Sequence, residues 1–301
     1  MTLFKSVSPH YCASLPGLFV SVASKHLALV AIATLCIATA MPSLAGSRIL
    51  GTGGVSAIEG AAGGGLSPWA VLSSTASEQE VGVTAAATRA WVNDYRLTVT
   101  GASLNIYDRA ELSVARQRLD LETLGGELSQ DIYGAKLRLF GDVLYHPWGI
   151  WSLGVQHKRV DDGTIPTALG ANATSGTDAY LSASKLLFSA VAGRNVLLNA
   201  TLRNTEANQG GLLGFGGDQG SRSWVAEGSV GVFITPQWIV GAEYRQKPDN
   251  LSAAQEDDWQ SLYSAYFFNK HLSLTGAWLD LGDIAGLPSQ QGGYLSLQAA
   301  F

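Results

Sequence analysis

Residues 292–301 read GGYLSLQAAF, and this stretch decides the fold class. One set of alternate positions is mostly apolar: Gly293, Leu295, Leu297, Ala299 and Phe301. The other set is more polar: Tyr294, Ser296, Gln298 and Ala300. A period of two with a single apolar face predicts a β-strand that is buried on one side.

The aromatic end of this strand resembles the C-terminal signal of bacterial outer-membrane β-barrels. The resemblance implies that residues 291–301 close the barrel and that Phe301 is an insertion signal, read by the barrel-insertion machinery. It also implies that the C-terminus lies at the periplasmic rim. Each upstream loop can then be assigned to one side of the membrane by counting back along the chain.

Bulk composition agrees with a membrane barrel. The 301 residues are 47% hydrophobic and only 14% charged, with 35 glycines. Beyond the N-terminal leader, no stretch has the roughly 20 consecutive apolar residues that a transmembrane helix needs. Apolar residues spread over many alternating segments are typical of barrels that cross the membrane with strands.

The N-terminus predicts an export signal over residues 1–45. Lys5 and Lys25 precede the apolar run 27–40, and small residues follow near Ala45, where we expect cleavage. Cys12 and Cys36, the two cysteines, both lie in this leader, so the mature chain has no disulfide or thiolate site. Removing two lysines from 19 basic residues leaves 17 against 24 acidic ones, a net charge of −7 that argues against nucleic acid. We expect no cofactor.

From residue 80 onwards the pattern predicts an antiparallel barrel of about twelve strands. The expected strands are 80–92, 95–106, 110–120, 129–141, 149–160, 177–189, 195–206, 222–234, 238–248, 257–268, 271–282 and 291–301. The connections alternate between long and short, which is the rule for extracellular loops and periplasmic turns. The very short connection 93–94 breaks this rule.

The segment 46–79 is rich in glycine and almost free of charge. We expect it to be either a plug inside the barrel, bent at Gly63, Gly64 and Gly65, or a first strand. Residues 66–75 leave the strand count open, because an extra strand there would have to split to give fourteen. A phosphate-binding loop is disfavoured, since the glycines lack the required spacing.

Residues 52–70, TGGVSAIEGAAGGGLSPWA, resemble the N-terminal signature of a family of proteobacterial outer-membrane proteins of unknown function. The resemblance runs over the whole mature chain. It implies an outer-membrane barrel at residues 80–301 and carries no activity, ligand or site residue with it.

Charged residues that alternate with apolar ones should point into the barrel, since a Lys or Arg facing lipid costs roughly 2–4 kcal/mol at the midplane. The inward, pore-lining candidates are Lys136, Arg138, Lys158, Arg203, Glu227, Glu243 and Arg245. These residues could line a pore for polar solutes or fill a closed barrel as paired side chains. Arg116 and Arg118 share parity with apolar residues, so either a bulge intervenes or they lie beyond the hydrocarbon.

An enzyme or a metal site has little support in the sequence. His157 should lie on the outer face, but no serine or asparagine is grouped with it as lipid hydrolysis would require. The acidic runs at 161–162 and 256–258 belong to outer loops, where they could attract Ca²⁺ or bridge lipopolysaccharide.

The sequence therefore predicts an exported outer-membrane barrel in contact with membrane lipid and lipopolysaccharide. Its expected function is that of a narrow, porin-like channel for passive transport of small solutes. A non-conducting structural or surface-interaction barrel is the alternative, and a lipid-acting enzyme is a distant third.

Overall fold

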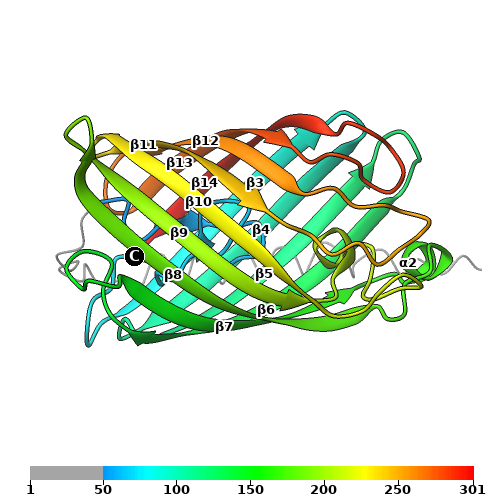
Figure 1. Cartoon of the computed structure of the whole chain (residues 1–301), viewed down its shortest axis with the longest axis horizontal. Helices are drawn as coiled ribbons and strands as arrows, with labels where there is room; N and C mark the ends of the chain where they lie inside the picture. The colour runs from blue at the N-terminus through cyan, green and yellow to red at the C-terminus, as the bar shows by residue number, and fades with distance from the viewer. Residues whose placement is uncertain (1–49) are drawn as a thin grey trace, which may run out of the picture. The chain divides into compact units, whose positions relative to one another are not determined.

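The computed structural model describes residues 50–301. The predicted signal peptide, including Ala45, lies outside the described residues. Within them, two short strands come first, β1 (Val55–Ser56) and β2 (Ala62–Gly63), and they pair with each other outside the main sheet. Every longer strand belongs to one closed sheet (Figure 1).

The closed sheet contains twelve strands among the described residues. They are β3 (Val81–Val92), β4 (Tyr95–Ile106), β5 (Ala110–Leu121), β6 (Glu127–Phe140), β7 (Ile150–Val160), β8 (Ser175–Val191), β9 (Arg194–Thr205), β10 (Ser223–Thr235), β11 (Trp238–Arg245), β12 (Trp259–Phe267), β13 (Leu272–Asp280) and β14 (Gln291–Ala300). Each strand pairs antiparallel with the next. The barrel closes where β14 pairs with β3, for example at Leu297 and Ala87.

The twelve predicted strands and the antiparallel barrel are therefore confirmed, with ends that shift by a few residues. The largest shift is in β11, which ends at Arg245 rather than at 248. The suggestion of an extra strand at 66–75 is wrong, because these residues form only an isolated bridge between Gly63 and Pro68. No helix among residues 50–301 is long and apolar enough to cross a membrane.

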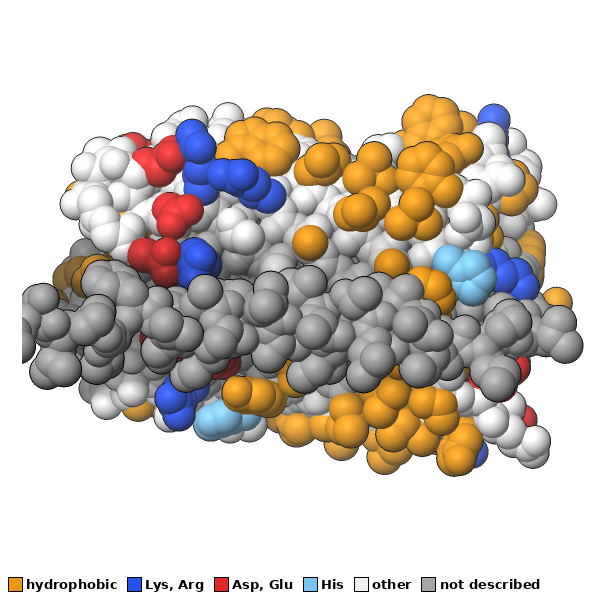
Figure 2. Space-filling view, turned by 180° about the vertical axis from the view of Figure 1, so that it is seen from behind, with side chains coloured by type: hydrophobic (Ala, Val, Ile, Leu, Met, Phe, Trp, Pro, Cys, Tyr) orange, Lys and Arg blue, Asp and Glu red, His pale blue; other side chains and the backbone are white. Residues whose placement is uncertain are grey.

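The alternation seen in the sequence separates the two faces of the wall. On β14, Leu295 and Leu297 are about half exposed on the outside, while Tyr294 and Ser296 are buried inside. Figure 2 shows that apolar side chains cover much of the outer surface. An apolar exterior on a closed sheet suits lipid, since closure leaves no unpaired strand edge in the hydrocarbon.

The two ends of the barrel differ, and we name them by their connections. The long-loop end carries the loops 122–126, 161–174, 206–222, 246–258 and 281–290, with the short helices α2 (Thr164–Ala168) and η1 (Asn208–Gly211). The short-turn end carries 107–109, 141–149, 192–193, 236–237 and 268–271. The short connection 93–94 also lies at the long-loop end. It contacts the neighbouring loop 281–290, where the Asn93 side chain donates a hydrogen bond to the Ser289 carbonyl.

Arg116 and Arg118 lie on the outer face near the long-loop end. β5 pairs with β4 and β6 without a bulge, so the bulge suggested for these residues is wrong. Arg116 forms ion pairs with Asp131 and Asp161, and Arg118 forms one with Glu127. Figure 2 shows acidic and basic side chains gathered on this end of the visible face, where charged groups can meet lipid headgroups instead of hydrocarbon.

Candidate functional site inside the barrel

Residues 50–76, which we call the lumenal segment, occupy the interior of the barrel (Figure 1). Almost all of them are buried, including Glu59, Leu66 and Trp69. The inward side chains of the wall bind their backbone directly. Ala70 N–H donates to Ser184 Oγ at 3.0 Å, and Thr201 Oγ1 donates to the Pro68 carbonyl at 2.8 Å. The wall therefore supplies polar partners to a segment that has little secondary structure of its own.

Glu59 is the centre of a buried charge network. Its carboxylate lies 2.5 Å from Lys158 Nζ, 2.9 Å from Arg203 Nη2 and 2.7 Å from Arg245 Nη2. These cations project from three different strands, β7, β9 and β11. A single acidic side chain of the lumenal segment thus forms ion pairs with three wall residues that are far apart in the sequence.

Two wall carboxylates complete this network. Asp178 lies 2.8 Å from Lys158 and 3.2 Å from Arg203, while Glu227 lies 2.5 Å from Arg203. Three acids therefore face three bases, and the group as a whole is neutral. Without Glu59, the wall would keep one uncompensated positive charge in a buried site. We call these six residues the Glu59 network.

Lys136 forms a second anchor. Its ammonium donates to the carbonyls of Ala62 and Val71, at 3.0 and 2.9 Å, and lies 3.2 Å from Glu111. Glu111 in turn accepts hydrogen bonds from the amides of Ala62 and Ser73. The pair holds both donors and acceptors of the lumenal backbone, so it fixes the position of two distant parts of the segment.

Glu243 holds the glycine turn. It accepts from the Leu66 amide at 3.0 Å and from Ser67 Oγ at 3.2 Å. Gly64 and Gly65 pass so close to the wall that a Cβ would overlap the Glu243 carboxylate at Gly64 and the Tyr294 hydroxyl at Gly65. At Gly63, a Cβ would overlap the Ser67 carbonyl instead. The glycines are needed for close approach to the wall and for the turn itself.

Arg138 differs from the other predicted pore-lining residues. It lies at the short-turn end, where it pairs with Asp108 and donates to the Gly141 carbonyl. Its side-chain hydrogen bonds and its ion pair go to Asp108 and Gly141, and not to residues 50–76. Phe301 lies at the same end, where its backbone pairs with Val83 in both directions and its ring stacks on His271.

Sequence reasoning missed the most connected residue, Glu59. It is the only acid between residues 46 and 75, and a lone acid in an apolar segment is a signal that could have been used. Glu111 and Asp178 were also missed, although both share parity with inward polar residues of their strands. Their pairing with particular partners could not be read from any one strand.

The loops of the long-loop end fold inward over the lumenal segment. Lys247 Nζ donates to Gln209 Oε1 at 2.8 Å and lies 3.4 Å from Glu256, which accepts from the Gln209 amide at 2.8 Å. Burial raises the pKa of Glu256 to about 7, although Lys247 opposes the shift. Burial also lowers the pKa of Lys247 to about 8. The pair joins loop 206–222 to loop 246–258.

Neither His157 nor the loop acids form a catalytic or metal arrangement in the structure. His157 is exposed on the outer face, and its Nδ1 lies 3.0 Å from Thr177 Oγ1. Asp161 is paired with Arg116, and Asp162 accepts from Thr164. Within residues 50–301, no three His, Cys, Asp or Glu side chains lie together as metal ligands would.

One protein family matches this chain over residues 52–298, a range that includes most of the lumenal segment and nearly all of the barrel. The chain belongs to the family described as protein of unknown function DUF3034. The expected membership of an uncharacterised family is thereby confirmed. No curated protein matches the chain.

Solved outer-membrane proteins share a similar fold with this DUF3034 chain at low identity. The outer-membrane protein Omp33 of Acinetobacter baumannii is 10% identical, with a TM-score of 0.46, over 74% of this chain and 99% of that one. The NanC porin is 10% identical, with a TM-score of 0.44, over 73% and 98%. The COG4313 outer-membrane channel from Pseudomonas putida F1 is 11% identical, with a TM-score of 0.41, over 76% and 97%.

Proposed function

We propose that this protein is an outer-membrane channel for small solutes, kept closed by residues 50–76 until they move aside. The observation that carries the proposal is the Glu59 network. The lumenal segment is fastened to the wall by charge pairs and single hydrogen bonds from Glu59, Lys136 and Glu243. A segment that served only to fill a core would be expected to rely on apolar contacts alone.

Charge pairs suit a plug that must be released. A buried ion pair contributes little net stability relative to the same two ions separated in water, because the cost of removing both ions from water offsets their attraction. If the segment leaves, the wall charges of the Glu59 network face water and line the opening together with Lys136 and Glu243. Both signs of charge are present there, so we expect weak selectivity between small cations and anions.

A non-conducting barrel is the second candidate, and a specific observation favours it. The lumenal segment fills the interior, and the loops 206–222 and 246–258 fold over it through Lys247 and Glu256. Such a barrel would act through its surface, for example by binding other envelope components. The two candidates differ only in whether the segment ever leaves the lumen.

The membrane and its lipids are the partners that we propose for the outer face. The support is the exposed apolar surface of the strands and the charged band formed by Arg116, Arg118 and their acidic neighbours near the long-loop end. The band is at the level where lipopolysaccharide phosphates would lie if this end is extracellular. The proposal includes no enzymatic activity.

Single-channel conductance in a planar bilayer tests the proposal. We would compare the mature protein with the variant that lacks residues 46–75 and with Glu59→Gln. A closed mature protein that conducts after either change would support a plugged channel. Absence of current from all three proteins, each shown to be folded and inserted, would refute the channel and leave the non-conducting barrel.

A further inference from the structure

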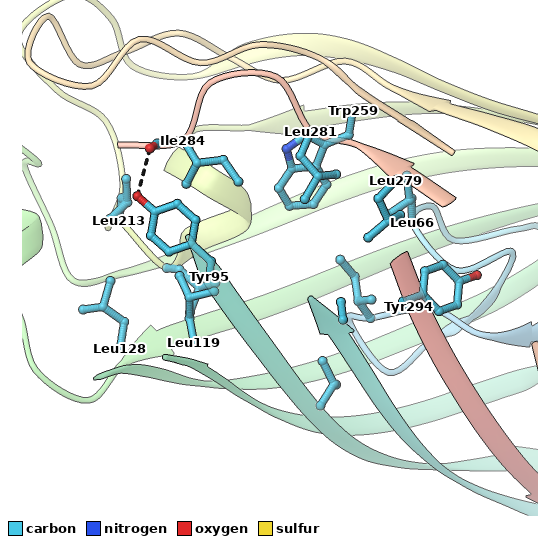
Figure 3. Packing of buried hydrophobic residues seen from close by; sticks show 14 of the residues in the cluster. Leu66, Tyr95, Leu119, Leu128, Leu213, Trp259, Leu279, Leu281, Ile284 and Tyr294 are labelled. Atoms are coloured by element: carbon cyan, nitrogen blue, oxygen red, sulfur yellow. Dashed lines mark hydrogen bonds between the residues drawn. The ribbon is translucent and has the colours of Figure 1, made fainter. Parts of the chain in front are cut away.

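An apolar cavity lies between the lumenal segment and the loops of the long-loop end. The free space inside it is about 60 Å³, and the surface that faces this space is formed by carbon atoms alone. Ile58 and Leu66 of the lumenal segment line one side. Leu119 and Leu279 of the wall line the flanks, and Leu212 of loop 206–222 lies opposite the segment. Figure 3 shows Leu66, Leu119 and Leu279 from close by, among the buried apolar side chains of this region.

The tyrosines around the cavity turn only their rings towards it. Tyr95 donates its hydroxyl to the Ile284 carbonyl at 3.0 Å, as the dashed line in Figure 3 shows. Tyr294 directs its hydroxyl to the Gly64 carbonyl at 3.4 Å. Because both polar atoms have partners in the protein, the aromatic faces are left as apolar surface. A molecule in the cavity is therefore surrounded by apolar side chains from the barrel strands, the lumenal segment and the loops.

The cavity is distinct from the Glu59 network, although the two are adjacent. Ile58 belongs to the cavity, and the next residue, Glu59, belongs to the network. A charged or strongly polar molecule in the cavity would lose its hydration and gain no hydrogen bond, which is costly. An apolar molecule gains free energy in proportion to the area that it removes from water.

We propose that this cavity binds one small, uncharged, apolar molecule, no larger than a single ring. Its small volume excludes a protein partner or a long lipid chain. The assignment of such molecules as solutes of the barrel rests on the proposed function; the binding site itself does not. The mixed charges deeper in the lumen would then act after the solute has left this first, apolar site.

Nuclear Overhauser effects between toluene and leucine methyl groups of the full mature protein test the proposal. Micelles also dissolve toluene, so the outward residues Leu295 and Leu297 report non-specific contact, while Leu66, Leu119 and Leu279 report the cavity. We expect toluene to give effects at all three inward residues.

Ala90→Leu is the variant that tests the position of the site. Ala90 lines the cavity, so the larger side chain should occupy the space of the ligand and abolish the inward effects. Ala86→Leu is the matched control, since it lies on the inner face of the same strand outside the cavity, and should leave them unchanged. Leu212→Trp fills the cavity from a loop, and gives the same test if Ala90→Leu does not fold.

Effects at the outward leucines alone would overturn the proposal, and so would inward effects that survive both cavity-filling variants. Conductance plays no part in this readout. A barrel that binds toluene but never conducts would refute the proposed function and leave the site standing. A protein that conducts but shows no nuclear Overhauser effect from toluene at Leu66, Leu119 and Leu279 would refute the binding site and leave the proposed function standing.

Discussion

Glu59→Gln should release the lumenal segment from the wall. The substitution keeps the size of the side chain and removes the charge that Lys158, Arg203 and Arg245 share. Three bases would then face only Asp178 and Glu227 in a buried site. Removing one partner of a buried ion pair costs roughly 3–5 kcal/mol. At about 1.4 kcal/mol per factor of ten, the displaced population should rise by roughly 150-fold to roughly 4,000-fold.

Cysteine labelling can measure this population. The two native cysteines lie in the predicted leader, so a cysteine placed at residue 73 is the single thiol of the mature chain. Ser73 is a suitable site because it is buried, and its hydroxyl has no partner among residues 50–301. When displacement is fast and reversible, the rate of maleimide labelling follows the population of the displaced state. We expect Ser73→Cys to react slowly alone and much faster together with Glu59→Gln.

Glu78→Gln provides the matched control, because it removes the same charge from an exposed residue just after the lumenal segment. It should leave the labelling rate unchanged. The double variant Glu59→Gln with Lys158→Gln restores neutrality of the network and should label more slowly than Glu59→Gln alone. Equal labelling in Glu59→Gln and Glu78→Gln would refute the reasoning, since the network would then contribute nothing to holding the segment.

Four further outcomes are expected. Gly64→Ala should speed the same labelling at residue 73, since its Cβ would overlap the Glu243 carboxylate, whereas Gly276→Ala has room and should not. The side chain of Glu256 forms an ion pair with Lys247. Asp249 is a further charged neighbour of Glu256, and Arg245 and Asp257 are charged neighbours of Lys247. The pKa of Glu256 is raised from 4.5 to about 7, so the folded loops favour its protonated form. The stability that this group contributes to loop closure is therefore full below pH 4.5 and is lost as the pH rises through 7. Hydrogen exchange at the Gln209 amide, corrected for intrinsic rate, should therefore slow between pH 7 and 5, and Glu256→Gln should abolish that change. Leu297→Arg should lower the free energy of unfolding in bilayers by about 2–4 kcal/mol, with Leu124→Arg in an exposed loop as a neutral control. Phe301→Ala should reduce the amount of folded barrel in outer membranes, as shown by heat-modifiable migration, if the assembly machinery reads this residue; unchanged migration would contradict that role.

The strands could be predicted because their pattern is local. On β14 the outward leucines and the inward Tyr294 and Ser296 alternate without a break, and the same holds on β5 around Arg116. Each residue contributes to the pattern independently, through the free energy of placing its own side chain in lipid or in the interior. At Arg116 and Arg118 the sequence left two alternatives, a bulge or a position beyond the hydrocarbon, because parity alone does not tell how far along the strand the hydrocarbon extends; the regular pairing of β5 excludes the bulge.

The lumenal site was less predictable. The inward lysines and arginines were expected from parity, but their common partner Glu59 was not, and Arg138 proved to lie at the short-turn end with Asp108. The apolar cavity was not expected at all. Its lining comes from the lumenal segment, six strands and two loops, and none of these has a sequence pattern that marks a ligand site.

By itself, the sequence determined the class of fold, the approximate bounds of the strands after residue 80 and the face on which each alternating side chain lies, whereas the strand count stayed open at residues 66–75. These properties follow from a period of two that is complete within ten or twelve residues. Only the tertiary structure decided which charges meet, because Glu59 and Arg245 are brought together by the closure of the barrel and the path of the segment inside it. Contacts over such separations depend on strand register and chain direction together, and no single stretch of sequence contains both.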